Sequence, residues 1–122
     1  YLNVHEGPHQ IRMEYKPAPL HAGMTVTDEP GLYLAGRFGV RIENTLLILK
    51  DRETEFGTFL KMEPLTLCPI DTTPIVVSML TAEEIRWLDT YHQHVCTMLS
   101  PHLEADEREW LQEATKPIGE NG

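Results

Sequence analysis

Three segments of strand-like sequence, with alternating apolar and polar residues, lie around Gly36. Met24–Thr27 and Leu32–Leu34 come before it, and Phe38–Leu49 comes after it. A period of two is typical of half-buried β-strands, and glycine readily takes the positive φ that a tight turn requires. The sequence therefore predicts a β-hairpin that turns at Ala35–Arg37, with Phe38–Leu49 as one long strand.

The position of the turn also predicts which residues face each other. In an antiparallel hairpin centred on Gly36, residues at equal distances from this glycine lie opposite one another. Glu29 and Glu43 meet this condition, as do Thr27 and Thr45 on the same polar face. We therefore expect two carboxylates to lie directly opposite each other.

Two opposing carboxylates destabilise a sheet unless a positive charge compensates them. Arg41 is one candidate, because it lies two residues from Glu43 on the same face. A divalent cation is the other, since hard metal ions take carboxylate oxygens as ligands. The alternatives are exposed glutamates that pair with Arg37 and Arg41 in water, and a bulge at Pro30–Gly31 that shifts the register. The pattern by itself leaves these interpretations open.

Further strands are predicted along the first, strand-rich region, residues 1–77. Phe59–Met62 and Leu65–Leu67 are short apolar runs on either side of Pro64, and the charged stretch Asp51–Gly57 before them is typical of a turn.

The second region, residues 78–122, predicts a helical tail. Thr81 and Glu84 have the spacing of a capping box. Apolar residues then recur at helical intervals as far as Ser100–Pro101, where the helix is expected to end. A shorter helix follows and closes before Pro117.

Composition and charge narrow the possible partners. Ten Lys and Arg against nineteen Asp and Glu give the 122-residue chain a formal net charge of −9. This charge argues against nucleic acid or an anionic membrane as the main partner, and no apolar run is long enough to span a bilayer. Because the sequence starts at Tyr1 in strand-like residues, we expect one domain that is a piece of a longer chain.

Cysteine and histidine positions predict no soft-metal site. Cys68 and Cys96 are far apart, which indicates reduced thiols in an intracellular protein, with one disulfide as the alternative. His92 and Cys96 lie one helical turn apart and could form half of a metal site, but core packing is favoured. His9 and His21 lie in proline-flanked loops, where we expect them to be solvated.

Three sequence motifs occur in order along the strand-rich region. They are Asn3–Pro8 (NVHEGP), Gly23–Tyr33 (GMTVTDEPGLY) and Phe38–Asn44 (FGVRIEN). Together they resemble the C-terminal part of the catalytic domain of aminopeptidase P, or Xaa-Pro aminopeptidase, a pita-bread metallopeptidase. The similarity continues through Met62–Ile70 and the tail, so it covers essentially the whole chain.

The resemblance implies an α+β fold that is the C-terminal portion of a pita-bread fold: an antiparallel sheet with a hairpin, followed by a helical tail. It implies a single partial catalytic domain. Residues 1–77 would form the strand-rich half with the metal site, and residues 78–122 a tail that contributes to a homodimer.

The resemblance also implies a site with two divalent metal ions, usually manganese in this family. Glu29 and Glu43 resemble the two glutamate ligands, and Glu43 is the one that bridges the metals. His5 resembles the active-site histidine that contacts substrate and helps to move protons. Arg41 resembles a residue that orients the carboxylate ligands, and Tyr33 one that lines the substrate pocket. The other ligands in this family, two Asp and one His, lie upstream of the matched part.

The implied activity is hydrolysis of the N-terminal residue from peptides with proline second, in the cytoplasm. Because the upstream ligands are absent from this sequence, we expect the chain alone to be inactive. A prolidase-like dipeptidase is one alternative. A metal-free pita-bread protein that serves as a binding or dimerisation module is the other.

Overall fold

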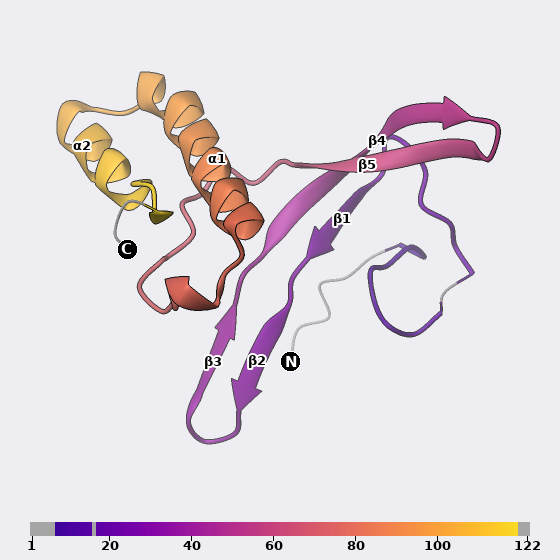
Figure 1. The fold of residues 1–122 in the computed structure, drawn as a ribbon, viewed down its shortest axis with the longest axis horizontal. Coiled ribbons are helices and arrows are strands. Elements are labelled where there is room, and N and C mark those ends of the chain that lie inside the picture. Colours follow the sequence, from indigo (N-terminus) through magenta and orange to yellow (C-terminus); the bar gives the residue numbers. More distant parts are fainter. Residues whose placement is uncertain (1–6, 16, 120–122) are drawn as a thin grey trace. The chain divides into compact units, whose positions relative to one another are not determined.

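The structure, a computed structural model, describes residues 7–15 and 17–119. The chain divides into two compact units, a strand unit of residues 1–66 and a helical unit of residues 67–122 (Figure 1). Residues 67–77, which the sequence groups with the strands, therefore belong to the same compact unit as the helices.

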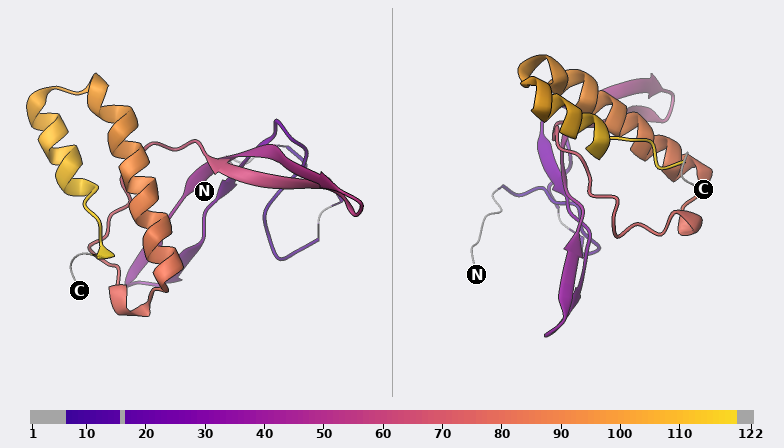
Figure 2. Two further views of the ribbon diagram at one scale, coloured as in Figure 1. Left: turned by 45° about the horizontal axis from the view of Figure 1, so that its top comes forward. Right: turned by 90° about the vertical axis from the view of Figure 1, so that its left-hand side faces the viewer.

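Two small antiparallel sheets form the described part of the strand unit. The strands are β1 (Thr25–Asp28), β2 (Gly31–Leu34), β3 (Phe38–Arg41), β4 (Asn44–Thr54) and β5 (Gly57–Pro64). One sheet has the order β1-β4-β5 and the other pairs β2 with β3. Along the chain β2 follows β1 and β4 follows β3, so the two sheets share one long two-stranded ribbon (Figure 2).

The predicted hairpin and its register are confirmed. Gly36 has a φ of 70°, and every pair in β1–β4 and β2–β3 is equidistant from it, as Thr27 and Thr45 are. Between the two sheets the Ile42 amide donates to the Pro30 carbonyl at 3.3 Å. The register therefore continues across the proline without a shift.

Three details of the strands differ from the prediction. Residues 38–49 belong to two strands, because β3 pairs with β2 whereas β4 pairs with β1, and the ladder breaks at Ile42–Glu43. The charged stretch Asp51–Thr54 continues β4, and the turn comes only before Gly57. β5 runs unbroken to Pro64, and residues 65–67 lie outside it.

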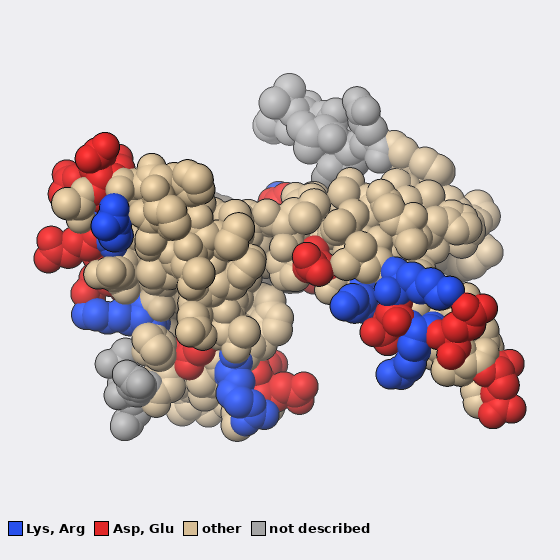
Figure 3. All heavy atoms as spheres, turned by 90° about the horizontal axis from the view of Figure 1, so that it is seen from above, with Lys and Arg blue, Asp and Glu red and all other residues tan. Residues whose placement is uncertain are grey.

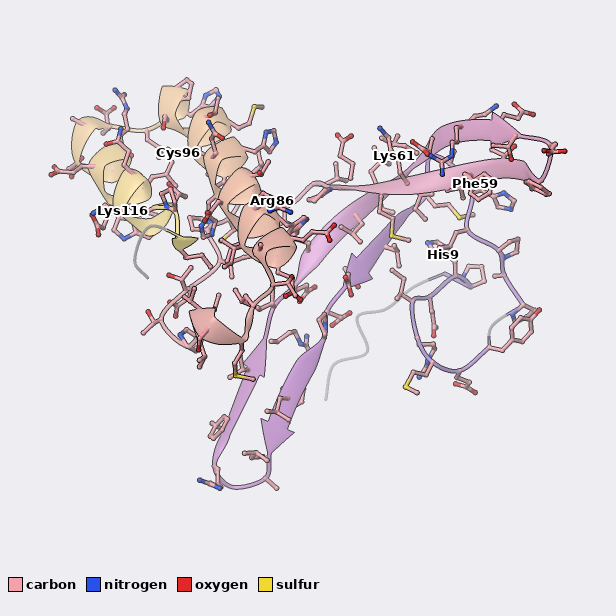
Figure 4. All side chains as sticks on the ribbon, in the orientation of Figure 1. His9, Phe59, Lys61, Arg86, Cys96 and Lys116 are labelled. Atoms are coloured by element: carbon pink, nitrogen blue, oxygen red, sulfur yellow. The ribbon has the colours of Figure 1, made fainter. Side chains whose placement is uncertain are left out.

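The charges of Asp51–Thr54 are accommodated on an exposed hairpin. Lys50 Nζ lies 2.6 Å from Glu53 Oε2, and the Arg52 guanidinium lies 5.4 Å from the centre of the Phe59 ring (Figure 4). Lysine and arginine alternate with acidic residues at this end of the molecule (Figure 3). Paired and stacked charges of this kind are compatible with a strand, which explains why a turn-like composition forms one.

The helical unit contains α1 (Ala82–Leu99) and α2 (Ala105–Ala114), with short 3₁₀ turns at Val77–Met79 and Ser100–His102. The predicted capping box begins α1: Thr81 Oγ1 accepts from the Glu84 amide at 3.2 Å, and Glu84 Oε2 accepts from the Thr81 amide at 2.7 Å. The two helices lie side by side (Figure 2). Between them is a core of buried apolar residues: Leu88, Tyr91, Val95, Leu111 and Ile118.

His92 belongs to this core. It is fully buried, and its Nε2 accepts the Ile70 amide at 3.0 Å. Cys96 Sγ lies 3.7 Å from Ser100 Oγ. Both cysteines of the chain are free thiols. The expected packing of His92 in the core is therefore confirmed.

The two loop histidines differ from each other. His21 is exposed, as expected. The expectation of a solvated His9 is wrong, because His9 is half-buried and its Nε2 lies 2.8 Å from the Thr25 carbonyl (Figure 4). This contact joins the preceding loop to β1. Within residues 7–15 and 17–119, no helix is long and apolar enough to cross a membrane.

Candidate metal centre

Polar residues line one face of the ribbon where its two sheets meet. Glu29 follows β1 and Glu43 precedes β4, so both lie at the break between the ladders. The register is the same on both sides of this break, and it places the two glutamates opposite each other. At the point where the carboxylates meet, two residues on each side of the ribbon lie outside the regular strands.

Arg41 joins the two carboxylates. Its Nη1 lies 3.0 Å from Glu29 Oε2 and 3.7 Å from Glu43 Oε2. Arg41 was one of the two predicted sources of compensating positive charge. Its guanidinium therefore lies between the opposing glutamates. One positive charge balances one of the two negative charges.

The two glutamates have different surroundings. The Glu29 side chain is 21% exposed, and its Oε1 accepts a hydrogen bond from Thr27 Oγ1 at 2.8 Å. Both carboxylate oxygens of Glu29 thus have a partner from the ribbon itself. The Glu43 side chain is 45% exposed and more open to solvent.

Tyr33 extends this network to the far side of Arg41. Arg41 Nε donates to the Tyr33 hydroxyl at 2.7 Å, and the guanidinium carbon lies 5.8 Å from the centre of the tyrosine ring. The hydrogen bond with Tyr33, together with the charges of Glu29 and Glu43, raises the pKa of Arg41 above its ordinary value. Arg41 is therefore held in its charged form and at both ends of its guanidinium.

The donor set fits part of a divalent metal site. Hard cations prefer carboxylate oxygens, and Glu29 and Glu43 present such oxygens to one place. The two glutamates would supply part of the coordination of a divalent ion. Among the described residues no group of three His, Cys, Asp or Glu could hold a metal.

Of the residues singled out from the sequence, four come together here: Glu29, Glu43, Arg41 and Tyr33. His5 lies outside the described residues. The contact between Thr27 and Glu29 was not expected from the sequence, although residues two apart in extended backbone lie on the same face.

Known proteins match the chain along nearly all its length. The family described as "Metallopeptidase family M24" matches residues 1–50, and the "C-terminal region of peptidase_M24" matches residues 58–118. Aminopeptidase P1 of Lotus japonicus is 48% identical over 98% of this chain and 19% of its own length. Aminopeptidase P1 of Arabidopsis thaliana is 47% identical over 97% of this chain and 19% of its own length.

A solved structure shows the same fold. X-prolyl aminopeptidase from Caenorhabditis elegans, described as a cytosolic enzyme with a di-nuclear active site, superposes with a TM-score of 0.83 at 41% identity. The match covers 96% of this chain and 20% of that protein. The chain thus spans about a fifth of the length of these relatives. The chain belongs to metallopeptidase family M24, and its α+β fold is the C-terminal portion of the pita-bread fold found in aminopeptidase P.

Proposed function

We propose that this chain is the C-terminal part of a Xaa-Pro aminopeptidase, which removes the N-terminal residue from peptides with proline second. The observation that carries the proposal is the pair of opposing glutamates, Glu29 and Glu43, which share Arg41. The names of the aminopeptidase P relatives and the di-nuclear site of the C. elegans protein support it.

Glu29 and Glu43 would hold two divalent metal ions, which we propose to be manganese, together with ligands from the rest of the protein. When bound, such a pair lowers the pKa of a water molecule and polarises the scissile carbonyl. Neighbouring residues of this chain position the two carboxylates. Thr27 and Arg41 fix the oxygens of Glu29, and Arg41 keeps Glu43 beside it.

Two residues would act on the peptide. Tyr33 is 60% exposed beside Arg41, which suits a residue that lines the substrate pocket. His5, assigned from its motif, would stabilise the developing oxyanion or donate a proton to the leaving proline nitrogen.

A cellular location and an oligomeric state are proposed for the whole protein. We propose a cytoplasmic enzyme, as the C. elegans protein is described, and a homodimer to which the helical tail contributes. With only two ligands for the metals among its described residues, the chain alone would be inactive. A prolidase-like dipeptidase is the less favoured enzyme, because the aminopeptidase P relatives match 97–98% of the chain.

The rival function is a metal-free binding or dimerisation module. What favours it is that no group of three metal-ligating side chains lies within the described part of the chain. Such a protein would keep the fold of the family and use it for contacts alone.

One experiment separates these functions. The longest natural polypeptide that contains this sequence is incubated with a Xaa-Pro-Xaa peptide while Mn²⁺ is added stepwise. Release of the first residue, dependent on Mn²⁺ and lost in Glu43→Gln, is the expected result. Glu63→Gln is the matched control, because Glu63 is also an exposed glutamate of the strand unit but is not one of the two opposing glutamates. A folded protein that releases nothing at any metal concentration would favour the metal-free module.

A further inference from the structure

The hairpin β2–β3 places each of two long side chains opposite a glycine. Tyr33 pairs with Gly39, and Arg41 pairs with Gly31. Residues directly opposite in an antiparallel pair share a face, so Tyr33 and Arg41 lie on a diagonal of the same face. The two glycines occupy the other diagonal.

Both glycines lie directly beneath the tyrosine ring. A Cβ added to Gly39 would lie 2.5 Å from Tyr33 Cδ1, and one added to Gly31 would lie 2.6 Å from the Tyr33 hydroxyl oxygen. Neither distance is possible for real atoms. Because Gly31 and Gly39 are not among the glycines with a positive φ, they are required here for space and not for backbone conformation.

The space above the glycines determines where the tyrosine hydroxyl lies. With 60% of Tyr33 exposed, burial in a core does not hold the ring. The ring lies against the backbone of Gly31 and Gly39, and this position brings its hydroxyl to 2.7 Å from Arg41 Nε. Glycine is unfavourable within strands and often marks a site of close approach, which agrees with this arrangement.

The fixed position of the Arg41 guanidinium in turn orients the two carboxylates. A guanidinium fixed at Nε by Tyr33 directs Nη1 towards Glu29 and Glu43, at 3.0 and 3.7 Å. A planar guanidinium transmits orientation in a way that a flexible ammonium cannot.

We propose that Gly31 and Gly39 are positioning residues of the metal centre, acting through the Tyr33 ring and Arg41 on Glu29 and Glu43. The inference rests on the proposed function, since it assigns these glycines a part in metal binding. A larger residue at position 39 would displace the ring, separate its hydroxyl from Arg41 and leave the guanidinium less firmly directed towards the two carboxylates.

The test measures Mn²⁺ affinity by titration calorimetry in the longest natural polypeptide that contains the sequence. Residues that orient metal ligands are typically worth about 10- to 100-fold in affinity, and we expect a loss of this size for Gly39→Ala. Val40→Ala is the matched control, because Val40 is the next residue of β3 and points to the other face. We expect it to change affinity by less than about twofold.

A double mutant shows whether Gly39 acts through the tyrosine hydroxyl. Tyr33→Phe removes the hydroxyl and keeps the ring, so adding Gly39→Ala to it is expected to weaken Mn²⁺ binding by less than about twofold more. A full additional loss in the Tyr33→Phe background would overturn the inference, because Gly39 would then act by another route. If Gly39→Ala does not fold, adding Tyr33→Ala, which removes the ring, is expected to restore folding. A double variant that still does not fold would overturn the inferred contact between the ring and position 39.

Failure of this inference is distinct from failure of the proposed function. A wild-type protein that binds no Mn²⁺ contradicts the proposed function and the inference with it. A wild-type protein that binds Mn²⁺ and hydrolyses the peptide, with both properties unchanged in Gly39→Ala, contradicts the inference alone.

Discussion

His92 is a fully buried titratable residue of the helical unit. Its Nε2 accepts the Ile70 amide, so the proton of the neutral ring is assigned to Nδ1, which is buried without a hydrogen-bond partner. Burial lowers the pKa of His92 from its ordinary value of 6.5. Protonation would place a charge in the core and set a new donor against the amide donor of Ile70.

The folded protein should therefore lose stability on acidification through His92. The unfolded chain takes up this proton near pH 6.5 and the folded chain only at lower pH, so stability is complete above about pH 6.5 and falls below it. His92→Gln, which cannot titrate, should reduce this slope. Urea unfolding at several pH values measures it, with the exposed His21→Gln as control. Equal slopes in wild type and His92→Gln would show that another group is responsible.

At Arg41, the shape of the side chain should matter more than its charge. Arg41→Lys keeps the charge but removes the Nε donor to Tyr33 and the planar fork between the glutamates. We expect Mn²⁺ affinity to fall by about 10- to 100-fold. Stability should change little, because the ion pairs are partly exposed.

Titration calorimetry and thermal melting of the same samples check both expectations. Arg52→Lys on β4 is the control, as Arg52 also contacts an aromatic ring. Unchanged Mn²⁺ affinity in Arg41→Lys would mean that charge alone suffices.

Among the secondary-structure elements, α1 is stabilised at its start by hydrogen bonds within the first turn. The reciprocal bonds between Thr81 and Glu84 satisfy two backbone donors at its start. The hydrogen bonds that Glu84 accepts from Thr81 lower the pKa of the Glu84 carboxyl group. The bond from the Thr81 amide has the largest effect.

Removal of this cap should destabilise the helical unit. Thr81→Ala is expected to cost about 1 kcal/mol, and Thr81→Ser to restore most of it because the hydroxyl remains. Denaturation followed by circular dichroism measures both. A Thr81→Ala protein as stable as Thr81→Ser would mean that the hydroxyl contributes little.

The hairpin and both helices were predictable because their signals are local. A turn glycine fixes the register around it, and Thr81 with Glu84 marks a helix start. The division of residues 38–49 between two sheets was not predictable, because the alternation runs on through Ile42–Glu43 and the choice of partner strand depends on tertiary structure.

Some features of the candidate site were predictable from the sequence and others were not. The opposition of Glu29 and Glu43 follows from counting residues around the turn, and the assignment of metal-ligand roles rests on the resemblance. The hydrogen bond from Arg41 to Tyr33 could not be predicted, because it depends on how the ring lies over Gly39, and strand pattern gives the face of a side chain but not its direction along that face.

At the scale of the whole molecule, many large apolar residues of the strand unit remain exposed. They include Leu32, Phe38, Val40, Phe59, Leu60 and Met62. Because the chain spans about a fifth of its relatives, we expect this surface to be covered in a longer protein. Exposed apolar patches of this kind favour association.

The chain by itself should therefore associate or dissolve poorly. Sedimentation velocity over a range of concentrations is the measurement, with the longest natural polypeptide as the comparison. A monomer at every concentration, with a single sharp thermal transition, would speak against this expectation.

The guanidinium shared by Glu29 and Glu43 has a consequence for the protein before any metal arrives. Arg41 serves as an internal counter-ion, so half of the negative charge of the two carboxylates is neutralised from within the ribbon. The ribbon also has its own backbone ladder on both sides of the two glutamates. If Glu29 and Glu43 hold metal as proposed, loading would add to an assembled hairpin, unlike zinc fingers, in which metal binding and folding are one event.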